Sequence, residues 1–323
     1  MRLVMASATE EKNKPVRGRS LWLYAGQRFM RGKKGPICLA IILIIYGAGI
    51  FAPLIAPFHY DQQNLGQSLK PPSLEHPFGT DRLGRDVFSR IVYGVRTTVI
   101  VTIAAMAAGG LLIGIALGLI SGYFGRFLDS LIMRIGEIFL AFPDILLVIL
   151  IAATVKPRVT EWVHGLESTI GIQGIVRSGL VDYLVVFGAL ATVSWVGMAR
   201  VVRGQVLTLK ESQYVMAARA LGASHWRIIF RHIFPNLLPP IIVLVSVGMG
   251  GIAGSEVALS WLGLGVQPPV PSLGVMIFDN GDISVLRTTP YLLLFPVITV
   301  AVIIFAFNLL GDALNDALNP KSR

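Results

Sequence analysis

The chain has 323 residues, of which 54% are hydrophobic and only 14% are charged, and its formal net charge is +10. Soluble domains carry about 25% charged residues, so this composition predicts an integral membrane protein and excludes an ordinary soluble domain. The basic residues border apolar runs, where the anionic inner face of a membrane attracts them, and this position argues against a nucleic-acid partner.

The first 96 residues are predicted to form a tail, a first membrane span and an outer loop. Residues 1–36 are polar and basic. The apolar run from Ile37 to about Pro57 has roughly the 20 residues that cross a hydrocarbon core, and it lacks the shorter apolar region and small residues of a cleavable signal peptide. We therefore expect an uncleaved span. Cys38, the one cysteine of the sequence, lies in this run, so neither an internal disulfide nor a cysteine metal site can form.

The polar segment over 59–96 mixes acidic, basic and apolar residues, most densely between His76 and Arg90. Apolar residues at helical spacing predict an amphipathic helix at the membrane surface here. The neighbouring Asp and Arg residues have the chemistry of an acid–base pair. We favour local ion pairs that hold the segment in shape, because such surface pairs are common and weak.

The second apolar segment runs from Thr97 to about Ile120 and contains glycines four residues apart. This spacing makes a groove along one helix face, where another helix can approach closely. Close packing matters because apolar contact alone does not drive helix association within lipid. The glycines of this predicted packing face are Gly110, Gly114, Gly118 and Gly122.

Four more apolar segments follow. The third span is predicted after a short polar turn over 121–136 and reaches about Val155, with a kink at Pro143. A polar loop over 156–180 comes next. The fourth, fifth and sixth spans are predicted at 182–199, 237–258 and 291–310. Of the 28 Lys and Arg residues, 19 lie in the two tails, the 121–136 turn and the loop over 200–236. This bias predicts that both termini and that loop are cytoplasmic.

The loop over 200–236 is predicted to fold as a helix–turn–helix on the membrane surface, with two small alanines exposed at one spot where a partner can approach closely. Gly222 suits the left-handed residue that ends a helix. Ser224 can cap the next helix, and Pro235 is expected to end it. The residues that share one face of the first helix are Tyr214, Ala217, Ala218 and Leu221.

This loop resembles the EAA loop of bacterial ABC-importer permeases, in which Glu-Ala-Ala is followed by a glycine and, further on, by a histidine and Pro-Asn. Met216 stands at the acidic position of the pattern. In that family the loop is the coupling element that seats in a cleft of the ATP-hydrolysing subunit. The residues that the resemblance assigns to coupling are Tyr214, Met216, Ala217, Ala218, Arg219, Leu221, Gly222, His232, Pro235 and Asn236.

Three further segments resemble the C-type subunits of dipeptide and oligopeptide permeases. They are Phe-Gly-Thr-Asp-x-x-Gly-Arg-Asp at 78–86, Leu-Ser-Trp-Leu-Gly-Leu-Gly-Val-Gln-Pro-Pro at 259–269, and the C-terminal stretch over 307–320. Trp261 replaces a phenylalanine of the family pattern, and Asn315 stands where an arginine is common. With the EAA loop, the resemblance covers nearly the whole chain.

The resemblance implies an all-α membrane protein of the type I importer (MetI-like) architecture, with six transmembrane helices and a cytoplasmic coupling helix between the fourth and fifth. It divides the chain into a tail, first span and outer loop (1–96), a permease domain (97–311) and a cytoplasmic tail (312–323). It also implies a multi-pass protein of the bacterial inner membrane, in contact with lipid. The implied protein partners are a second permease subunit, two ATP-binding cassette subunits and an extracytoplasmic solute-binding protein.

The sequence contains no Gly-x-x-x-x-Gly-Lys-Ser/Thr phosphate loop, no His-Glu-x-x-His and no Gly-x-Ser-x-Gly. We therefore expect no enzyme activity, cofactor or metal in this chain, and ATP and Mg²⁺ on the partner ATPases. Ionisable residues in spans are costly and usually face water or the bundle interior. Asp144 and Glu256 are thus candidates for the translocation path. The alternative for each is an interface position or a hydrogen-bonded structural carboxylate.

The predicted function is half of the translocation path of an ATP-driven importer for dipeptides or oligopeptides. Nickel complexes or another small solute are alternative cargoes. A self-sufficient secondary transporter is the alternative from another class, and it would show broken helices at matching positions of an inverted repeat. Pro143 has no clear counterpart in the second half. A membrane-embedded enzyme is disfavoured because no paired catalytic groups lie within a span.

Overall fold

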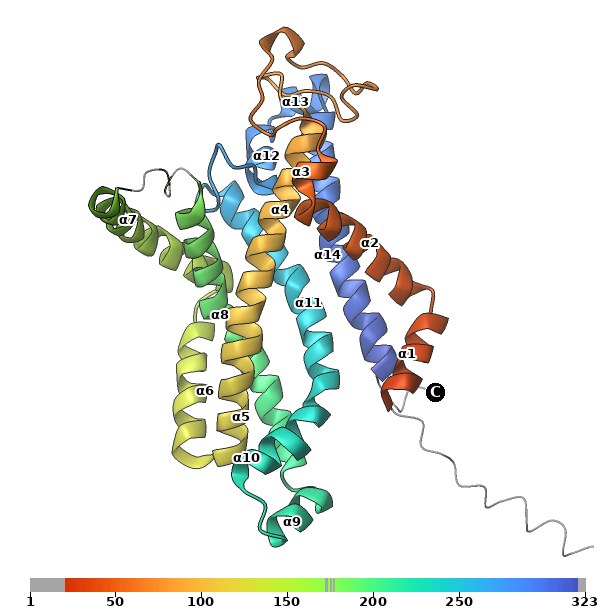
Figure 1. The fold of residues 1–323 in the computed structure, drawn as a ribbon, viewed down its shortest axis with the longest axis vertical. Helices are drawn as coiled ribbons and strands as arrows, with labels where there is room; N and C mark the ends of the chain where they lie inside the picture. The colour runs from red at the N-terminus through yellow and green to blue at the C-terminus, as the bar shows by residue number, and fades with distance from the viewer. Residues whose placement is uncertain (1–20, 172–173, 175, 177, 319–323) are drawn as a thin grey trace, which may run out of the picture.

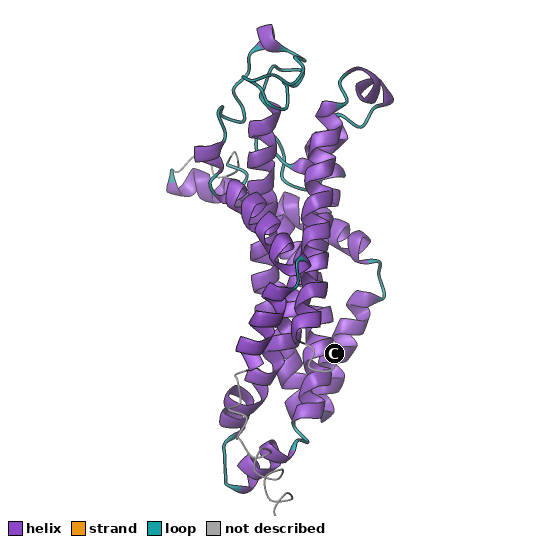
Figure 2. Cartoon of the chain, turned by 90° about the vertical axis from the view of Figure 1, so that its right-hand side faces the viewer, coloured by secondary structure: helices purple, strands orange, loops and turns teal. Residues whose placement is uncertain are grey.

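Long apolar helices make up most of the fold, and the computed structural model describes residues 21–171, 174, 176 and 178–318. No strand occurs among these described residues. The helices gather into an elongated bundle, shown from two perpendicular sides in Figures 1 and 2. In chain order they are α1 (Leu21–Arg31), α2 (Lys34–Ile50), α3 (Ala52–Ile55), η1 (Leu65–Gln67), α4 (Val87–Ala105), η2 (Met106–Gly114), α5 (Ile115–Phe124), α6 (Arg126–Leu140), α7 (Asp144–Ile170), α8 (Leu180–Leu209), α9 (Gln213–Ala220), α10 (His225–Ile228), η3 (Ile229–Ile233), α11 (Phe234–Trp261), α12 (Leu273–Asp279), α13 (Ile283–Thr288) and α14 (Tyr291–Leu318).

Four helical stretches of the described chain are long and apolar enough to cross a membrane alone: Val87–Phe124, Leu180–Leu209, His225–Trp261 and Tyr291–Leu318. Two more stretches meet this test only as bent pairs. Leu23–Arg31 is bent by 88° from Lys34–Ile50, and Arg126–Leu140 by 89° from Asp144–Thr169. The described residues therefore hold four candidate spans, or up to six if each bent pair is one span. These stretches follow the predicted order, although several boundaries differ.

The second predicted span begins at Val87 instead of Thr97. Residues 76–86 form an irregular loop, so the predicted amphipathic helix is wrong over this stretch. Asp86 explains the boundary. Its carboxylate accepts a hydrogen bond from the backbone N–H of Ser89 at 2.7 Å, which is the N-cap contact that starts a helix.

Charged side chains hold the loop before α4, as predicted. Arg85 Nε and Arg90 Nη1 both donate to Asp81 Oδ2, at 2.7 and 2.6 Å. The other oxygen of Asp81 accepts the backbone N–H of Arg85 at 3.0 Å. His76 Nδ1 lies 3.0 Å from Asp86 Oδ1. The side chains of these pairs are mostly buried, namely His76, Asp81, Asp86 and Arg90. The pairs therefore hold the loop in shape from inside and are not solvent-exposed surface pairs.

The predicted polar turn over 121–136 is mostly helix. Only Gly125, with a φ of +61°, makes the turn between α5 and α6. The polar residues that suggested a longer turn lie along α6, where Asp129 has a partner on α8 that a sequence does not reveal. Polar residues in this segment are therefore compatible with a helix, because their partners lie on a neighbouring helix.

The predicted polar loop over 156–180 is also wrong in its first part, because α7 continues to Ile170 with Pro157 inside it. A tertiary contact supports this extension. The Lys156 ammonium lies 2.9 Å from the carboxylate of Asp182 at the start of α8. The ion pair holds α7 beside α8, and the polar residues of this stretch lie on a helix.

Three of the four predicted packing glycines lie against α8. An added Cβ would come within 2.7 Å of a Cβ on α8 at each, pairing Gly114 with Met198, Gly118 with Val202 and Gly122 with Val206. Gly110 departs from this face, because its added Cβ would meet Met106 of the same helix, and Gly109 takes its place against Ala191. The cause is the π-helical segment η2, whose wider turns shift the packing face by one residue.

The two ends of the bundle differ in content (Figure 1). α9 and α10 form one end, whereas α13 and the loop before α4 form the other. α1 and the end of α14 lie toward the α9 end. The segments predicted to share the cytoplasmic side therefore lie toward one end, and which side of a membrane it faces stays a prediction. The tail residues 1–20 and 319–323 lie outside the described residues.

We expect Gly118→Leu to lower the free energy of unfolding by about 1–3 kcal/mol, because the new side chain would push Val202 and separate α5 from α8. Equilibrium unfolding of the purified protein in mixed detergent micelles measures this loss. Gly188→Ala is the matched control, since an added Cβ at Gly188 meets nothing within 4 Å. An equal loss of unfolding free energy in both variants would show that the glycine face does not pack against α8.

Candidate functional site

One end of the bundle carries a short helix–turn–helix, which we call the tip (residues 213–228). Gly222 follows α9 with a φ of +79°, a conformation that a side chain would strain. Ser224 caps α10 by accepting a hydrogen bond from the N–H of Arg227 at 3.4 Å. The helix, the glycine turn and the serine cap therefore lie where local sequence signals predict them.

The second helix does not end at Pro235, so that prediction is wrong. α10, η3 and α11 form one helical stretch, His225–Trp261. Pro235 lies in the first turn of α11, directly after the π-helical η3. Hydrogen bonding already departs from the α-helical pattern there, so the missing N–H disrupts less. Asn236 Nδ2 donates to the carbonyl of His232 at 2.7 Å and supports the same turn.

The tip presents an apolar surface to solvent. Val215 is the buried residue of α9, whereas Leu221 is 89% exposed. Ala218 is half-buried. The other predicted coupling residues of α9 and its turn are exposed, namely Tyr214, Met216, Ala217, Arg219, Leu221 and Gly222. Large apolar side chains that are exposed close together on a protein are typical of an interaction site.

Two aromatic side chains that no sequence pattern singled out extend this surface. Trp226 and Phe230 stack with their ring centroids 5.8 Å apart, and they are 65% and 58% exposed. The two aromatic residues are four positions apart, so they lie on one face of the helix, opposite the buried Ile228 and Ile229. This spacing is the sequence signal that could have predicted the exposed pair.

A buried apolar cluster fastens the tip to the long helices. Val215 and Ile233 are fully buried, and Ile228 nearly so. They share one cluster with Val206 of α8 and Leu237 of α11. The cluster contains residues of both long helices, so the tip is packed against α8 and α11 together.

A polar clamp ties α8 to α5 and α6 near the same end. Arg203 donates through Nε and Nη2 to the two carboxylate oxygens of Asp129, the second at 2.6 Å. Ser121 of α5 also hydrogen-bonds this carboxylate. Lys210 Nζ donates to the carbonyl of Gly122 at 3.2 Å. Bidentate Arg–carboxylate pairs fix geometry strongly, so these helices are held as one unit with the tip.

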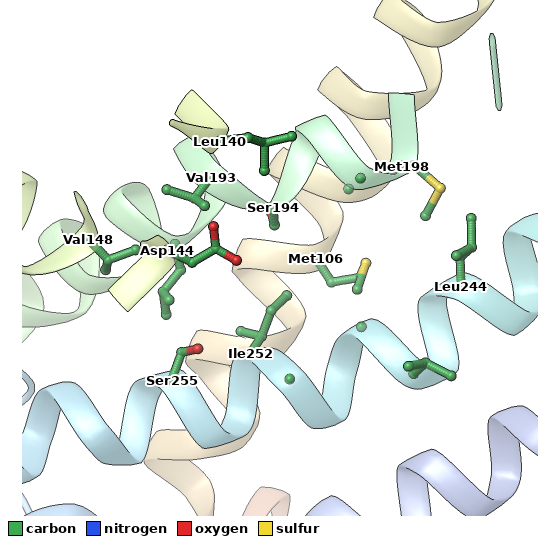
Figure 3. A pocket seen from close by; sticks show the side chains of 16 residues that line it. Met106, Leu140, Asp144, Val148, Val193, Ser194, Met198, Leu244, Ile252 and Ser255 are labelled. Carbon is green, nitrogen blue, oxygen red and sulfur yellow. The ribbon is translucent and has the colours of Figure 1, made fainter. Parts of the chain in front are cut away.

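A central cavity of about 400 Å³ lies between η2, α8, α11 and the break between α6 and α7 (Figure 3). Its walls are mostly apolar, and Gly110 is among the lining residues. Asp144, the first residue of α7, points its carboxylate into the cavity near Ser194 and Ser255. No described residue forms a hydrogen bond or ion pair with Asp144. An acidic group in an apolar cavity suits a cationic or amine-bearing ligand.

Glu256 adopts the alternative considered for it, a hydrogen-bonded structural carboxylate, and its place on the translocation path stays a prediction. Its side chain is fully buried and lines no part of the central cavity. It accepts hydrogen bonds from Thr98 Oγ1 at 2.8 Å, Ser260 Oγ at 2.9 Å and Ser272 Oγ at 3.4 Å. These hydroxyls come from α4, α11 and the residue before α12. In this conformation Glu256 joins three segments.

The described residues contain no group of three or more His, Cys, Asp or Glu side chains arranged to hold a metal ion. Among the described residues, two features are candidate functional sites. One is the exposed apolar tip, and the other is the central cavity with its single carboxylate.

Comparison with known proteins gives two family matches. Residues 114–323 match the family described as binding-protein-dependent transport system inner membrane component. Residues 20–72 match the N-terminal TM domain of oligopeptide transport permease C.

Individual relatives align over nearly the whole chain. The dipeptide transport system permease protein DppC of Alkalihalophilus pseudofirmus is 39% identical over 94% of this chain and 91% of its own. The oligopeptide transport system permease protein OppC of Bacillus subtilis is 37% identical over 98% of this chain and 95% of its own. The glutathione transport system permease protein GsiD of Pectobacterium atrosepticum is 36% identical over 94% of this chain and 92% of its own.

We expect Glu256→Leu to lower the free energy of unfolding by about 1–3 kcal/mol, because it leaves buried hydroxyls without their acceptor. Glu256→Gln keeps an acceptor oxygen and should lose less. Unfolding in mixed micelles compares both with the unchanged chain. If Glu256→Gln kept full stability but stopped transport, Glu256 would belong to the translocation path after all.

Proposed function

Because this chain belongs to the family of binding-protein-dependent transport system inner membrane components, we propose that it forms half of the translocation path of an ATP-driven peptide importer. The family resemblance of the sequence motifs is confirmed by relatives that align over 94% and 98% of the chain. Their names state dipeptide and oligopeptide transport, which supports peptides as the cargo. The chain itself would act without catalysis, with ATP and Mg²⁺ bound by partner subunits.

The observation that carries this proposal is the exposed apolar tip, which is fastened to two long helices. We infer that α9 is the coupling helix and seats in a cleft of an ATP-binding cassette subunit. Ala217 lies on the side of α9 away from the buried Val215, so a partner backbone can approach it closely. Met216 replaces the family's glutamate, so the contact would rely on apolar area and shape at this position.

The proposed mechanism is alternating access by rigid-body motion. Closure of two ATPases around ATP would displace the tip of each permease subunit. The buried cluster passes this displacement to α8 and α11, and the clamp of Asp129 and Arg203 carries α5 and α6 along. The central cavity lies between these helices, so their rotation would open it to one side and then the other.

The proposed topology counts each bent pair as one span, which gives six spans with α9 between the fourth and the fifth. Both termini would lie in the cytoplasm of a bacterium, and the chain would be an inner-membrane protein. The proposed division is 1–96, 97–311 and 312–323. A second permease subunit would complete the path, and an extracytoplasmic solute-binding protein would deliver the solute at the end opposite the tip.

Two alternatives remain distinct from this proposal. In the first, the mechanism is the same but the cargo is a nickel complex or another small solute. A relative named for glutathione transport is compatible with a peptide cargo instead. A self-sufficient secondary transporter would need neither ATP nor partners.

Reconstitution tests the function directly. We expect the complex with its second permease subunit, ATPases and binding protein to accumulate a radiolabelled tripeptide in liposomes only when ATP is present. The chain alone should transport nothing, because it forms half of a path. Full uptake by the purified chain without ATPases would refute the proposal, and dependence on a proton or sodium gradient would favour the secondary transporter.

Ala217→Arg should weaken binding of the ATPase subunits about tenfold or more, because the interface would bury an unpaired charge where an alanine stood. Co-purification of the ATPases with the permease in detergent measures the binding. Ser284→Arg is the matched control, since Ser284 is exposed in α13 at the opposite end. Undiminished co-purification of Ala217→Arg would remove α9 as the docking helix.

A further inference from the structure

A second hollow, the Arg96 cup, lies near the end of the bundle opposite the tip. It encloses about 220 Å³ between α4, α8, the loop after α3 and the loop before α12. The lining side chains that matter here are Tyr60, Tyr93, Arg96, Tyr183 and Pro271. No sequence motif marked this place, because its walls come from four separated segments.

Hydrogen bonds and ring contacts hold the walls of the cup in place. Tyr183 Oη lies 2.9 Å from Thr97 Oγ1, and Thr97 Oγ1 donates to the carbonyl of Pro271 at 2.8 Å. These bonds join α8, α4 and the loop before α12. On the other side, the rings of Tyr60 and Tyr93 pack edge to face with centroids 4.9 Å apart. The hollow is therefore built by the fold without a ligand.

A second layer of bonds supports the same walls. Asp182, next to Tyr183, accepts the backbone N–H of Gln267 at 3.0 Å and pairs with Lys156 at 2.9 Å. Asp182 is thus paired with a lysine. It holds the loop over 267–271 against α8 and leaves the cup without a negative charge from this side.

Arg96 is the charged group of the cup. The side chain is exposed, and no described residue forms an ion pair or hydrogen bond with it. Burial, with a smaller effect of Asp61, raises the pKa of Tyr60, so this phenol stays protonated at neutral pH and can donate a hydrogen bond. The Arg96 guanidinium and the Tyr60 hydroxyl both offer hydrogen-bond donors, and no carboxylate is among the residues that line the hollow.

We propose that the Arg96 cup binds the carboxylate end of the transported peptide as the peptide enters the path. A guanidinium offers two parallel N–H donors that match a carboxylate. Pockets for whole ligands measure about 300–1,000 Å³, so this smaller hollow suits one end of a solute. The proposal rests on the proposed function and specifies which part of the cargo is recognised at the end opposite the tip.

The cup and the central cavity would then serve different ends of one molecule. Arg96 near one end of the bundle and Asp144 in the cavity both lack an ion-pair partner among the described residues, and their side chains are of opposite charge type. A peptide with free termini has a carboxylate and an ammonium group. The two sites are therefore complementary to the two termini, and each can act at a different step.

Chemical footprinting tests the cup in the unchanged protein. In the complete transporter in nanodiscs, phenylglyoxal modifies accessible arginines, and mass spectrometry gives the rate at each. We expect the tripeptide Ala-Ala-Ala to slow modification of Arg96 and its carboxamide not to do so. Arg287, exposed at the same end but outside the cup, is the control and should react equally in all samples. Equal protection of Arg96 by acid and amide, or by neither, would overturn the proposal.

Lipid phosphate is the competing source of an anion. Nanodiscs made with and without anionic lipid separate the two sources. Protection that depends on the anionic lipid and is indifferent to the peptide would assign Arg96 to the lipid and overturn the proposal. Protection without any peptide or anionic lipid would also overturn it, because a partner subunit would then fill the cup.

Uptake by variants gives an independent readout. We expect Arg96→Gln to lower the uptake rate of Ala-Ala-Ala about tenfold, the value of one charge-assisted hydrogen bond, with Arg96→Lys intermediate and Arg287→Gln unchanged. Uptake of the carboxamide should not respond to Arg96. A loss shared by both peptides would point to a structural role and overturn the proposal. If the unchanged transporter takes up neither peptide in the presence of ATP, the proposed peptide-importer function is wrong. The footprinting result still tests peptide binding by the cup separately.

Discussion

The contact on which the rest of the structure depends is the buried apolar cluster under α9. Val215, Ile228 and Ile233 pack there with Val206 and Leu237. Inside a bilayer, apolar contacts between helices gain little because lipid is equally apolar. In the proposed topology the tip lies in water, where the same contacts are driven by the hydrophobic effect. The tip is thus fastened where apolar burial is most effective, and its outer face stays exposed for a partner.

Elsewhere between the long helices, other contacts add to the apolar packing. α5 and α8 approach closely because Gly114, Gly118 and Gly122 carry no side chain. The bidentate pair of Arg203 and Asp129 adds α6 to this unit. Buried hydroxyls around Glu256 join α4, α11 and the residue before α12. Steric fit and hydrogen bonds therefore add to the buried apolar clusters that hold the helices together.

Against these rigid contacts, the break between α6 and α7 is the irregular place in the bundle. A bend of 89° there puts Asp144 at the central cavity instead of on a helix flank. Together with Arg96, it is a charged side chain facing a hollow without a partner among the described residues. Charges elsewhere in the bundle, such as Asp129, Asp182 and Glu256, are satisfied by neighbours. Our proposals assign Asp144 and Arg96 to a solute, whereas these three carboxylates hold the fold.

The sequence by itself determined the membrane class, the order of the apolar segments, the turn at Gly222 and the cap at Ser224, and the family. Hydropathy and capping depend on residues close together in the chain, so a local pattern carries them. Only the tertiary structure decided that Gly109 replaces Gly110 in the packing face, that the chain stays helical through Pro157 and Pro235, and that Glu256 is buried. It also decided that Arg96 stands in a hollow with Tyr183. Each of these depends on contacts between distant segments, or on a shift in helical register, which no local spacing encodes.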